Sequence, residues 1–375
     1  MSWSQRNLGD LTKIRTGKLD ANASSEDGEY PFFTCARLPL RISSYTYDCE
    51  CLLVAGNGDL NVKYYDGKFD AYQRTYIIEA RPETAKELHV RYVYHFLETY
   101  LETLREQSIG GIIKYIKMGN LTEAQIPLPP LAEQKRIAGI LDAADALRAK
   151  SRESLAQLDT LLQSTFLDMF GDPVTNPMGW EEKSIETIAA DTKIGLVRSS
   201  KEFGWDYPIP YVRMDAVTND GRFLPEKVQF TEANEKEKEA FALRPGDFLF
   251  NTRNSKELVG KVCVFPGPDG WLFNNNLMRI RFRDEIEPSV VATQFQFRRV
   301  QRELEQRKSG TTSVFAVYWK SLRTLPVLVP PLDLQRRFAA IVESVERQKA
   351  RQRAHLAELD ALFASLQSRA FNGEL

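Results

Sequence analysis

The chain has 375 residues, of which 43% are hydrophobic and 27% charged, and its formal net charge is −1. This length exceeds the usual ~100–150 residues of one domain, and the composition is that of a folded protein rather than a disordered one. The sequence shows no basic-then-apolar leader and no apolar run of about 18 residues, so we expect neither export nor a membrane span, and we expect a cytoplasmic location.

Residues 1–128 predict a first domain that mixes strands and helices. Apolar, β-rich runs at residues 51–55 and 75–78 indicate strands, and an amphipathic pattern from about residue 85 to residue 107 indicates a helix. The four cysteines include Cys49 and Cys51, but no second pair or nearby histidine completes a zinc site. We therefore expect reduced or buried thiols and no bound metal.

Residues 129–172 predict a single long helix, over residues 131–170. Pro129 and Pro130 prepare its start, and the Gly171-Asp172-Pro173 run ends it. A helix of ~40 residues is ~60 Å long at 1.5 Å per residue.

Residues 173–329 predict a second mixed domain, with strand-like runs at 247–250 and 261–265, and residues 330–375 predict a second long helix over 332–371. Residues 1–125 carry 15 Lys and Arg against 17 Asp and Glu, and residues 173–325 carry 23 against 21. Neither segment has the basic balance of a DNA-binding domain that acts alone. Binding to DNA would need the basic residues on one face, or a partner that supplies phosphate contacts.

The two halves of the chain repeat each other. The stretch from Pro129 to Ile137 returns from Pro330 to Phe338, and the offset of 201 residues holds without a gap from Ser108 to Phe170. Solenoid repeats run roughly 20–50 residues, so this period indicates a duplicated domain-plus-helix unit instead. We predict an α+β protein with pseudo-twofold internal duplication, in which two mixed domains are separated by two long antiparallel coiled-coil helices.

The long helices carry a heptad-like apolar seam. Each seam has a polar middle, Arg148 and Ser151 in the first helix and Lys349 and Gln352 in the second. An antiparallel pair brings these middles together, and the two basic residues would repel unless an acidic neighbour or water intervenes. The sequence leaves that choice open. Packing alone explains one such helix, but two copies favour a scaffold that holds two domains at a fixed spacing.

The chain resembles the specificity subunits of type I restriction-modification systems. The resemblance is carried by Ile126–Gln134 before the first helix, by Phe166–Pro173 at its end and by the ending Ala370–Leu375. It covers the full chain as target recognition domain, helix, target recognition domain, helix. The second copy departs at Leu334, where the first has Glu133, so the two helices need not make identical partner contacts.

The resemblance implies a function and partners. Each target recognition domain reads one half of a bipartite site in double-stranded DNA, and the paired helices set the spacer. Two methyltransferase (modification) subunits dock on the helices and methylate adenine at N6 with S-adenosylmethionine. Restriction subunits add translocation and cleavage driven by ATP and Mg²⁺. The chain itself is implied to bind no cofactor and to catalyse nothing.

The residues are consistent with a chain that has no catalytic role. The sequence has no phosphate-binding G-x-x-x-x-G-K-[ST] loop and no H-E-x-x-H pair, and Asn176-Pro177-Met178-Gly179 does not match the Asn/Asp-Pro-Pro-aromatic motif of adenine methylation. Two alternatives stay open: a coiled-coil scaffold that does not bind DNA, favoured by the near-neutral charge, and a fused modification enzyme with an unrecognised centre.

Residues that read DNA are expected in loops, because base edges are contacted by polar and basic side chains and by closely approaching backbone. Each could equally be a solvent-exposed turn. The predicted DNA-binding residues fall in three places. The first is the turn after the central strand: Gly56, Asn57, Gly58, Lys63 and Tyr64 in the first copy, and Asn251, Thr252, Arg253, Asn254 and Lys256 in the second.

The second place precedes the next strand: Ser108, Gly110, Gly111 and Lys114, matched by Lys308, Ser309, Gly310, Thr311, Thr312 and Ser313. The third occurs in the second copy alone: Arg198, Ser199, Ser200 and Lys201, with Arg213. The sequence does not give the target bases or the spacer length, because readout depends on fold geometry and DNA shape. Nor does it show whether a restriction subunit is present.

Overall fold

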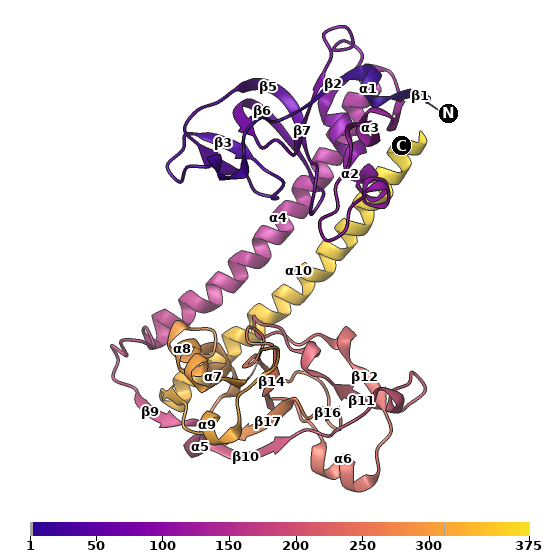
Figure 1. Cartoon of the computed structure of the whole chain (residues 1–375). Helices are drawn as coiled ribbons and strands as arrows, with labels where there is room; N and C mark the ends of the chain where they lie inside the picture. Colours follow the sequence, from indigo (N-terminus) through magenta and orange to yellow (C-terminus); the bar gives the residue numbers. More distant parts are fainter. Residues whose placement is uncertain (1–2, 311) are drawn as a thin grey trace. The chain divides into compact units, whose positions relative to one another are not determined.

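The computed structural model describes residues 3–310 and 312–375, which fall into two compact units (Figure 1). The first unit comprises residues 1–153 and 352–375, and the second comprises residues 154–351. Both units combine mixed sheets with helices, and each contains parts of both long helices. The α+β class, the duplication and the antiparallel long helices predicted from the sequence are confirmed.

The first unit is built on a six-stranded sheet. Its strands follow the order β2-β7-β5-β6-β3-β4, and neighbours are antiparallel except for β3 and β6, which are parallel. The bounds are β2 Thr12–Thr16, β3 Tyr30–Phe33, β4 Leu40–Ile42, β5 Tyr47–Ala55, β6 Val62–Ala71 and β7 Thr75–Ala80. The runs predicted as strands lie within β5 and β7.

Helix α2, Val90–Gln107, covers one face of this sheet. Val93 and Leu97 of α2 pack with Leu52 and Val54 of β5 in the main core of the unit. The helix begins about five residues later than the sequence pattern predicted. The reason lies in tertiary contacts of residues 84–89. The Thr84 hydroxyl donates to the Leu11 carbonyl at 2.6 Å, and the Gln134 side chain bonds the Glu87 carbonyl and the His89 amide, so this segment is held in a non-helical path.

Short elements close the first unit around its sheet. Strand β1, Ser4–Asn7, pairs antiparallel with β8, Gln125–Leu128, directly before the first long helix. The remaining short elements are α1 Leu8–Leu11, the 3-10 turn η1 Ala21–Ala23 and α3 Met118–Thr122.

The second unit repeats this plan with shorter strands. Its main sheet has the order β10-β17-β13-β15, which follows the same path as β2-β7-β5-β6, and β9 pairs with β20 as β1 pairs with β8. The bounds are β9 Glu181–Ser184, β10 Ala189–Ile194, β13 Phe248–Asn251, β15 Val262–Val264, β17 Leu277–Phe282 and β20 Pro326–Val329.

Two small sheets and several helices complete the second unit. One sheet holds β12 Gln229–Thr231, β11 Ile209–Val212 and β16 Leu272–Phe273, and the other holds β14 Arg253–Asn254, β19 Phe315–Ala316 and β18 Ser309–Gly310. The helices are α5 Ile185–Ile188, α6 Glu235–Phe241, α7 Pro288–Gln294, α8 Arg298–Arg307 and α9 Trp319–Leu322, with 3-10 turns η2 Ser200–Glu202, η3 Met214–Ala216 and η4 Pro225–Lys227.

The two long helices are α4, Leu131–Phe170, and α10, Leu332–Asn372, within one residue of their predicted ranges. Gly171 follows α4 with φ of +77°, a left-handed conformation that ends helices and suits glycine. None of the helices in the part of the chain that the structure describes is long and apolar enough to cross a membrane.

A buried glutamine anchors the start of each long helix. The Gln134 side chain donates to the carbonyls of Glu87 and Pro129, at 2.7 and 2.8 Å, and accepts from the His89 amide at 2.9 Å. Both Gln134 and its counterpart Gln335 are at most 1% exposed. The Gln of the repeated Pro-Pro-Leu-x-x-Gln sequence therefore ties the helix to the domain that precedes it.

Gln335 makes the same three bonds in the second unit. It donates to the carbonyls of Glu285 and Pro330, at 3.2 and 2.7 Å, and accepts from the Glu287 amide at 2.9 Å. The repeated sequence is thus explained by a repeated set of backbone contacts.

Candidate nucleic-acid interface

The structure brings two of the predicted DNA-binding loops of the first unit together. Asn57 and Tyr115 form an antiparallel bridge, the Gly58 amide donates to the Lys114 carbonyl at 3.0 Å, and the Ile116 amide donates to the Gly56 carbonyl at 2.9 Å. Residues 109 and 115 bond each other through both backbone groups, at 3.0 and 2.9 Å. Residues 109–115 therefore form a hairpin, which we call the first hairpin, beside the turn after β5.

The first hairpin has a tightly defined backbone. Gly110 has φ of +118°, and a Cβ atom there would lie 2.6 Å from the Ile113 carbonyl oxygen, so another residue would not fit without a shift. The hydroxyl of Tyr76 donates to the Ile116 carbonyl at 3.1 Å and ties the base of the hairpin to β7. Loops held this way can present side chains to a partner in a defined position.

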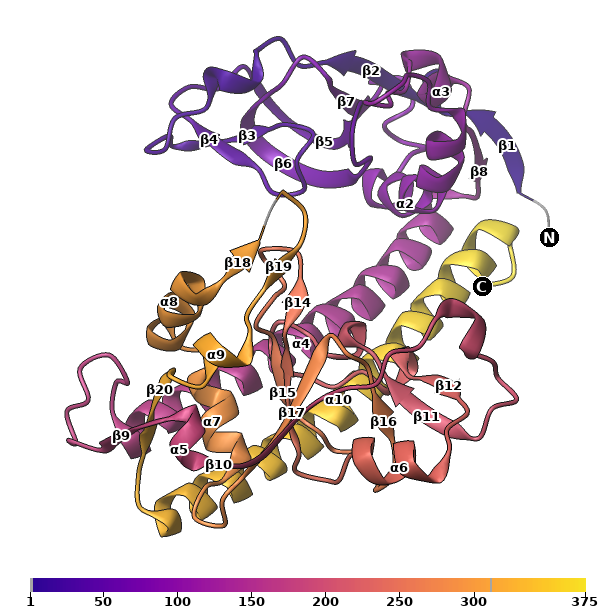
Figure 2. The ribbon, with the colours of Figure 1, turned by 60° about the horizontal axis from the view of Figure 1, so that its bottom comes forward.

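The same two loops meet in the second unit. Strand β14, which follows the main-sheet strand β13, pairs with β19, and β19 pairs with β18 (Figure 2). The Lys308 ammonium also donates to the Lys256 carbonyl at 2.7 Å. Residues 309–316, the second hairpin, therefore lie beside the turn after β13, as the first hairpin lies beside the turn after β5. Thr311 lies outside the described residues.

The two hairpins differ by one residue in register. Ile109 faces Tyr115 in the first, whereas Gly310 faces Phe315 in the second, so the gapless offset of 201 residues does not carry over to the strand pairing. Gly310 also has no room for a Cβ atom, which would lie 2.3 Å from the Val314 carbonyl oxygen. Both hairpins need glycine, but the loops that they present differ in shape as well as in sequence.

Several predicted site residues are held by intramolecular contacts. The Lys63 ammonium donates to the Asn61 side chain, and burial lowers the pKa of Lys63. The Tyr64 hydroxyl donates to the Glu50 carboxylate at 2.8 Å. Two residues of the second unit are held in the same way. Asn251 is fully buried and bonded to Asn254 at 3.1 Å, and the Lys308 ammonium is paired with Glu305 at 2.8 Å.

Other predicted residues present exposed backbone or side chains. In the first unit these are Gly58, Gly110, Gly111 and Lys114, with Asn57 and Ser108 half-buried beside them. In the second unit they are Arg253, Lys256, Ser309, Gly310, Thr312 and Ser313, with Thr252 buried at their edge. The exposed set contains the residue types that contact phosphates and base edges.

The third predicted place, residues 198–201 with Arg213, differs from the hairpins in its chemistry. Arg198 is only 10% exposed, and its guanidinium is bonded to Glu237 at 2.8 Å and to the Glu232 carbonyl at 2.9 Å. Arg198 therefore fixes α6 to the chain before η2. Glu237, one of the acidic residues of α6, has Arg198 as its structural partner. Ser199, Ser200 and Lys201 are exposed, and Arg213 is half-buried near Asp215, at 3.5 Å.

A cavity of about 590 Å³ in the second unit is lined by residues that belong to the predicted DNA-binding places or lie next to them. Thr252 and Arg253 line it from the turn after β13, and Asn275 and Asn276 line it from the segment before β17. Val197, next to Arg198, and Tyr318, just after the second hairpin, also line it. Asn275 and Asn276 belong to a run of three asparagines, a residue type whose side-chain amide can contact adenine.

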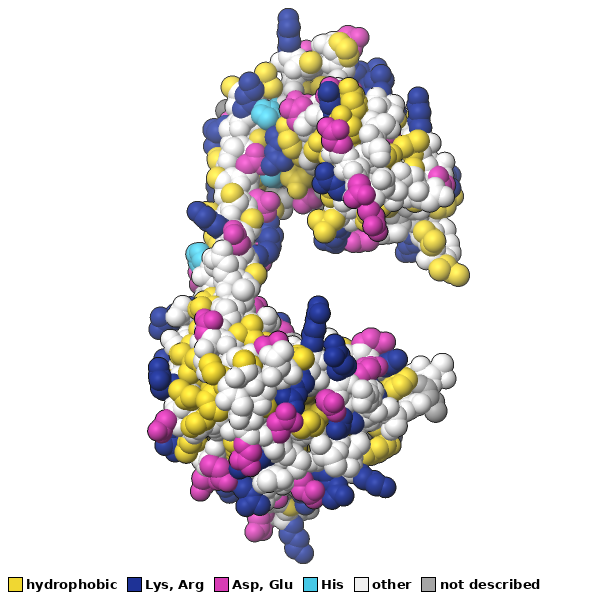
Figure 3. All heavy atoms as spheres, turned by 90° about the vertical axis from the view of Figure 1, so that its left-hand side faces the viewer, with side chains coloured by type: hydrophobic (Ala, Val, Ile, Leu, Met, Phe, Trp, Pro, Cys, Tyr) yellow, Lys and Arg dark blue, Asp and Glu magenta, His cyan; other side chains and the backbone are white. Residues whose placement is uncertain are grey.

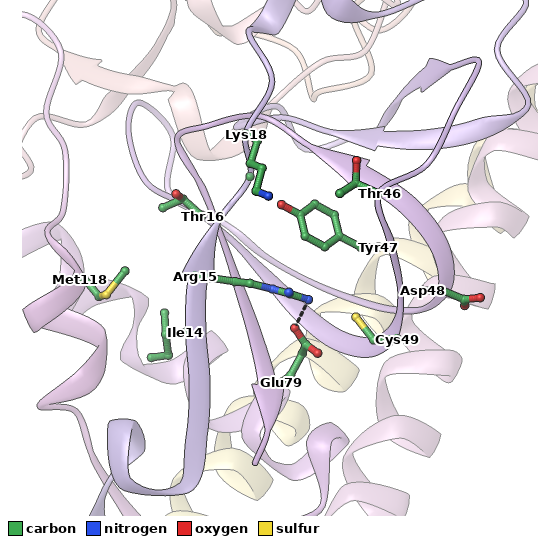
Figure 4. Close-up of a pocket in the computed structure, with 11 residues that line it drawn as sticks. Ile14, Arg15, Thr16, Lys18, Thr46, Tyr47, Asp48, Cys49, Glu79 and Met118 are labelled. Carbon is green, nitrogen blue, oxygen red and sulfur yellow. Dashed lines mark ion pairs between the residues drawn. The ribbon is translucent and has the colours of Figure 1, made fainter. Parts of the chain in front are cut away.

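The first unit has a different cavity, of about 670 Å³, between β2 and the start of β5 (Figure 4). Arg15 lies across it, paired with Glu79 and stacked over the Tyr47 ring at 4.6 Å, and Lys18 points toward the Tyr47 hydroxyl. Burial raises the pKa of Tyr47. None of the predicted DNA-binding residues lines this cavity, so it is separate from the loop pair described above.

The surface charge is mixed. On the face drawn in Figure 3, Lys and Arg side chains alternate with Asp and Glu on both units. The net charge of the whole chain is −1, so the basic groups beside the hairpins are balanced by acidic groups elsewhere on the chain. Such a surface does not favour tight non-specific binding to DNA by the chain alone.

Comparison with known proteins identifies the family. A family model described as the type I restriction modification DNA specificity domain matches residues 1–159 and 177–360. The chain therefore belongs to the family of type I restriction-modification specificity proteins, as its motifs indicated.

Two relatives show how far the similarity extends. The chain is 40% identical over 163 residues to the type I restriction enzyme EcoDI specificity subunit of Escherichia coli, covering 44% of this chain and 36% of that one. It is 27% identical over 321 residues to the EcoKI specificity subunit of Escherichia coli strain K12, covering 79% and 67%. The match thus spans about a third of the first relative and two thirds of the second.

Solved structures share the fold. The type I restriction-modification S subunit from M. genitalium matches with a TM-score of 0.65 at 16% identity, over 99% of this chain and 96% of that one. A chain from a structural study of complex assembly and conformational transition in the type I R-M system matches with a TM-score of 0.51 at 19% identity, over 100% and 98%. These similarities support the two-copy architecture.

Proposed function

We propose that this chain is the DNA specificity subunit of a type I restriction-modification complex. The observation that carries the proposal is the loop pair found in each unit, where a turn after the central strand is joined to a glycine-dependent hairpin. Two such pairs suit a bipartite target in double-stranded DNA. In this proposal, residues 1–128 read one half and residues 173–329 read the other.

The two half-sites should differ in sequence. The first loop pair offers Asn57, glycines and Lys114, whereas the second offers Arg253, Lys256 and hydroxyl side chains. An amide favours adenine, and a guanidinium favours guanine when it reaches the major groove. Because the two surfaces have different donors and acceptors, an asymmetric target follows.

The long helices, residues 129–172 and 330–375, would serve as the spacer element and as the docking surface for partners. Two methyltransferase subunits would bind along them and methylate adenine at N6 with S-adenosylmethionine. Restriction subunits would supply translocation and cleavage with ATP and Mg²⁺. The chain would contribute recognition and no catalysis, and its place of action would be the cytoplasm, where the DNA is.

A partner also accounts for the charge. A chain with a net charge of −1 has little overall electrostatic attraction to the DNA phosphates, and bound methyltransferase subunits can supply further phosphate contacts. We therefore expect weak DNA binding by the isolated chain and strong, sequence-specific binding by the assembled complex.

The test is selection of target DNA by the complex. The chain is co-expressed with a type I methyltransferase subunit from the same host, and the purified complex is used to enrich fragments from a random duplex pool. The proposal predicts enrichment of one asymmetric, two-part sequence with a fixed gap, bound with a steep salt dependence. Complex formation without enrichment of any sequence would favour the scaffold alternative instead.

A further inference from the structure

The tip of the first hairpin carries two isoleucines that have no place in the core. Ile112 is fully exposed, at 105% of its reference area, and Ile113 is 63% exposed. Gly111, which precedes them, has no atom within 4 Å of the position of a Cβ. The apolar pair therefore stands on a narrow tip, directly beside residues already proposed to approach DNA.

The tip is exposed although its base is firmly held. The bridges between Ile109 and Tyr115 and between Asn57 and Tyr115 fix the backbone on both sides. Ile112 and Ile113 are β-branched, so their side chains have few rotamers and lose little freedom on insertion into a partner. A stiff apolar tip on a narrow loop fits a narrow space better than a flat surface.

The surrounding charge favours a polyanion as the partner. Residues 107–122 contain Lys114 and Lys117 and no acidic residue, and both lysines are exposed. On the neighbouring turn, the Asp59 carboxylate is already paired with Arg37 at 2.9 Å. Positive charge beside an apolar tip is the combination by which proteins insert wedges into DNA, where lysines hold phosphates and the apolar group unstacks a base step.

We propose that Ile112 and Ile113 form an apolar wedge that inserts between neighbouring base pairs of duplex DNA at the half-site read by the first domain. This inference rests on the proposed function and adds to it a deformation of the DNA. The half-site would then be selected partly by how easily its base step unstacks, a property that is greatest at pyrimidine–purine steps.

The wedge is confined to one half of the molecule. Between its paired residues Gly310 and Phe315, the second hairpin has the sequence Thr311-Thr312-Ser313-Val314, which contains one apolar residue where the first hairpin has two. Ser313 is polar, and Val314 is 48% exposed. The second hairpin should therefore contact DNA without unstacking it, and the kink should lie in the first half-site alone.

The test uses the assembled complex and its enriched target duplex, with 2-aminopurine placed at successive positions of both half-sites. The fluorescence of this base rises when it is unstacked. The wild-type complex should give a rise of severalfold at one step of the first half-site. The double variant Ile112→Ser/Ile113→Ser should abolish that rise and weaken target binding by about 10–100-fold, which corresponds to about 1.4–2.8 kcal/mol at 1.4 kcal/mol per factor of ten.

Leu38→Ser is the matched control, because Leu38 is 79% exposed in the same unit and lies outside the hairpin. This control should leave the rise and the affinity within twofold of the wild type, and Val314→Ser, in the second hairpin, should leave the rise at the first half-site unchanged. All three variants change exposed side chains, so their melting temperatures should equal that of the wild type.

Three outcomes would overturn the wedge. The first is a fluorescence rise in the double variant equal to that of the wild type. The second is weaker DNA binding by the double variant when the wild type itself gives no rise. The third is loss of methyltransferase binding by the double variant, which would make the tip a protein contact. If the wild-type complex binds no DNA sequence specifically, the proposed function itself fails, and that result is separate from the other three.

Discussion

The guanidinium of Arg148 on α4 forms an ion pair with the Asp360 carboxylate on α10, with Nε 2.6 Å from Oδ1. The pair recurs in the second unit, where the Lys349 ammonium lies 2.6 Å from Asp159. Arg148 and Lys349 are 201 residues apart, as are Asp159 and Asp360. Each basic group has a second acidic partner three residues before it, Asp145 at 2.8 Å and Glu346 at 2.5 Å.

These pairs settle a point that the sequence left open. Acidic neighbours offset the charge of the two basic residues in the polar middles of the helices. Between the pairs, the Gln352 side chain donates to the Ser151 hydroxyl at 3.0 Å, and these two residues are also 201 apart. A polar contact at one seam position is a known device for fixing the register of paired helices.

We predict energetic coupling between Arg148 and Asp360. A cycle of Arg148→Ala, Asp360→Ala and the double variant should give a coupling free energy of about 0.5–1.5 kcal/mol, measured by denaturant unfolding, because the guanidinium is only 18% exposed. Arg347→Ala is the control: its pair with Glu343 is 64% and 70% exposed, and the change should stay within about 0.5 kcal/mol. Strict additivity of the two changes would refute the coupling.

We predict that Gln134→Ala destabilises the first unit by about 3 kcal/mol or more. The change leaves the buried Pro129 carbonyl and the partly buried Glu87 carbonyl and His89 amide without their partner, and each such group costs about 1–3 kcal/mol. Hydrogen exchange of the His89 amide should accelerate most. Gln163→Ala, at an exposed position of α4, should have little effect, and equal exchange rates in the two variants would contradict the anchoring role.

A third prediction concerns pH. His95 is 1% exposed and its Nε2 lies 2.8 Å from Asp142, which also binds Arg91. Burial lowers the pKa of His95 below 6.5, despite the opposing effect of Asp142. The folded state therefore binds a proton on His95 less readily than the unfolded state does. The stability that neutral His95 contributes is fully present above the unfolded-state pKa of about 6.5, and it is lost as the pH falls through the folded-state pKa.

The melting temperature of the first unit should therefore fall between pH 7 and pH 5. Burial raises the pKa of Asp142, but hydrogen bonds from Arg91 and His95 outweigh burial and lower it, so its own contribution is lost only at more acidic pH. The His95→Gln variant should show a flatter profile over pH 7 to 5. A variant profile as steep as that of the wild type would mean that other groups cause the loss.

The fourth prediction separates the two half-sites. Arg253→Ala should relax base preference in the half-site read by the second domain by about 1–3 kcal/mol and leave the other half unchanged, because Arg253 is exposed at the second loop pair. Lys236→Ala, exposed on α6, is the control of equal charge change. Altered preference in both halves would be incompatible with one domain per half-site.

The sequence predicted the parts of this fold that depend on repetition and long periodicity. The offset of 201 residues and the apolar seams placed α4 and α10 within one residue of their bounds. The start of α2 was predicted too early, because the contact between Thr84 and Leu11 joins residues 73 apart in the chain. Local propensity carries no information about such a contact.

The candidate site could be predicted in outline only. Sequence reasoning found the loops around Asn57, Arg253 and the two hairpins, since glycine and polar residues mark turns. It could not show that Arg198 is held by Glu237, because the two residues are 39 apart and meet through the fold. It also missed Ile112 and Ile113, since an apolar pair in a sequence is expected to be buried, and the flanking Gly110-Gly111 was the one available signal.

The most direct test of the central claim is the N6-methyladenine map of the host genome, with and without this gene. The proposed function predicts loss of one asymmetric, two-part motif with a fixed gap when the gene is deleted. With the Arg253→Ala variant in its place, the map should show a change in one half of that motif. A complete methylation motif that survives the deletion while the methyltransferase is expressed would contradict the assignment of DNA recognition to this chain.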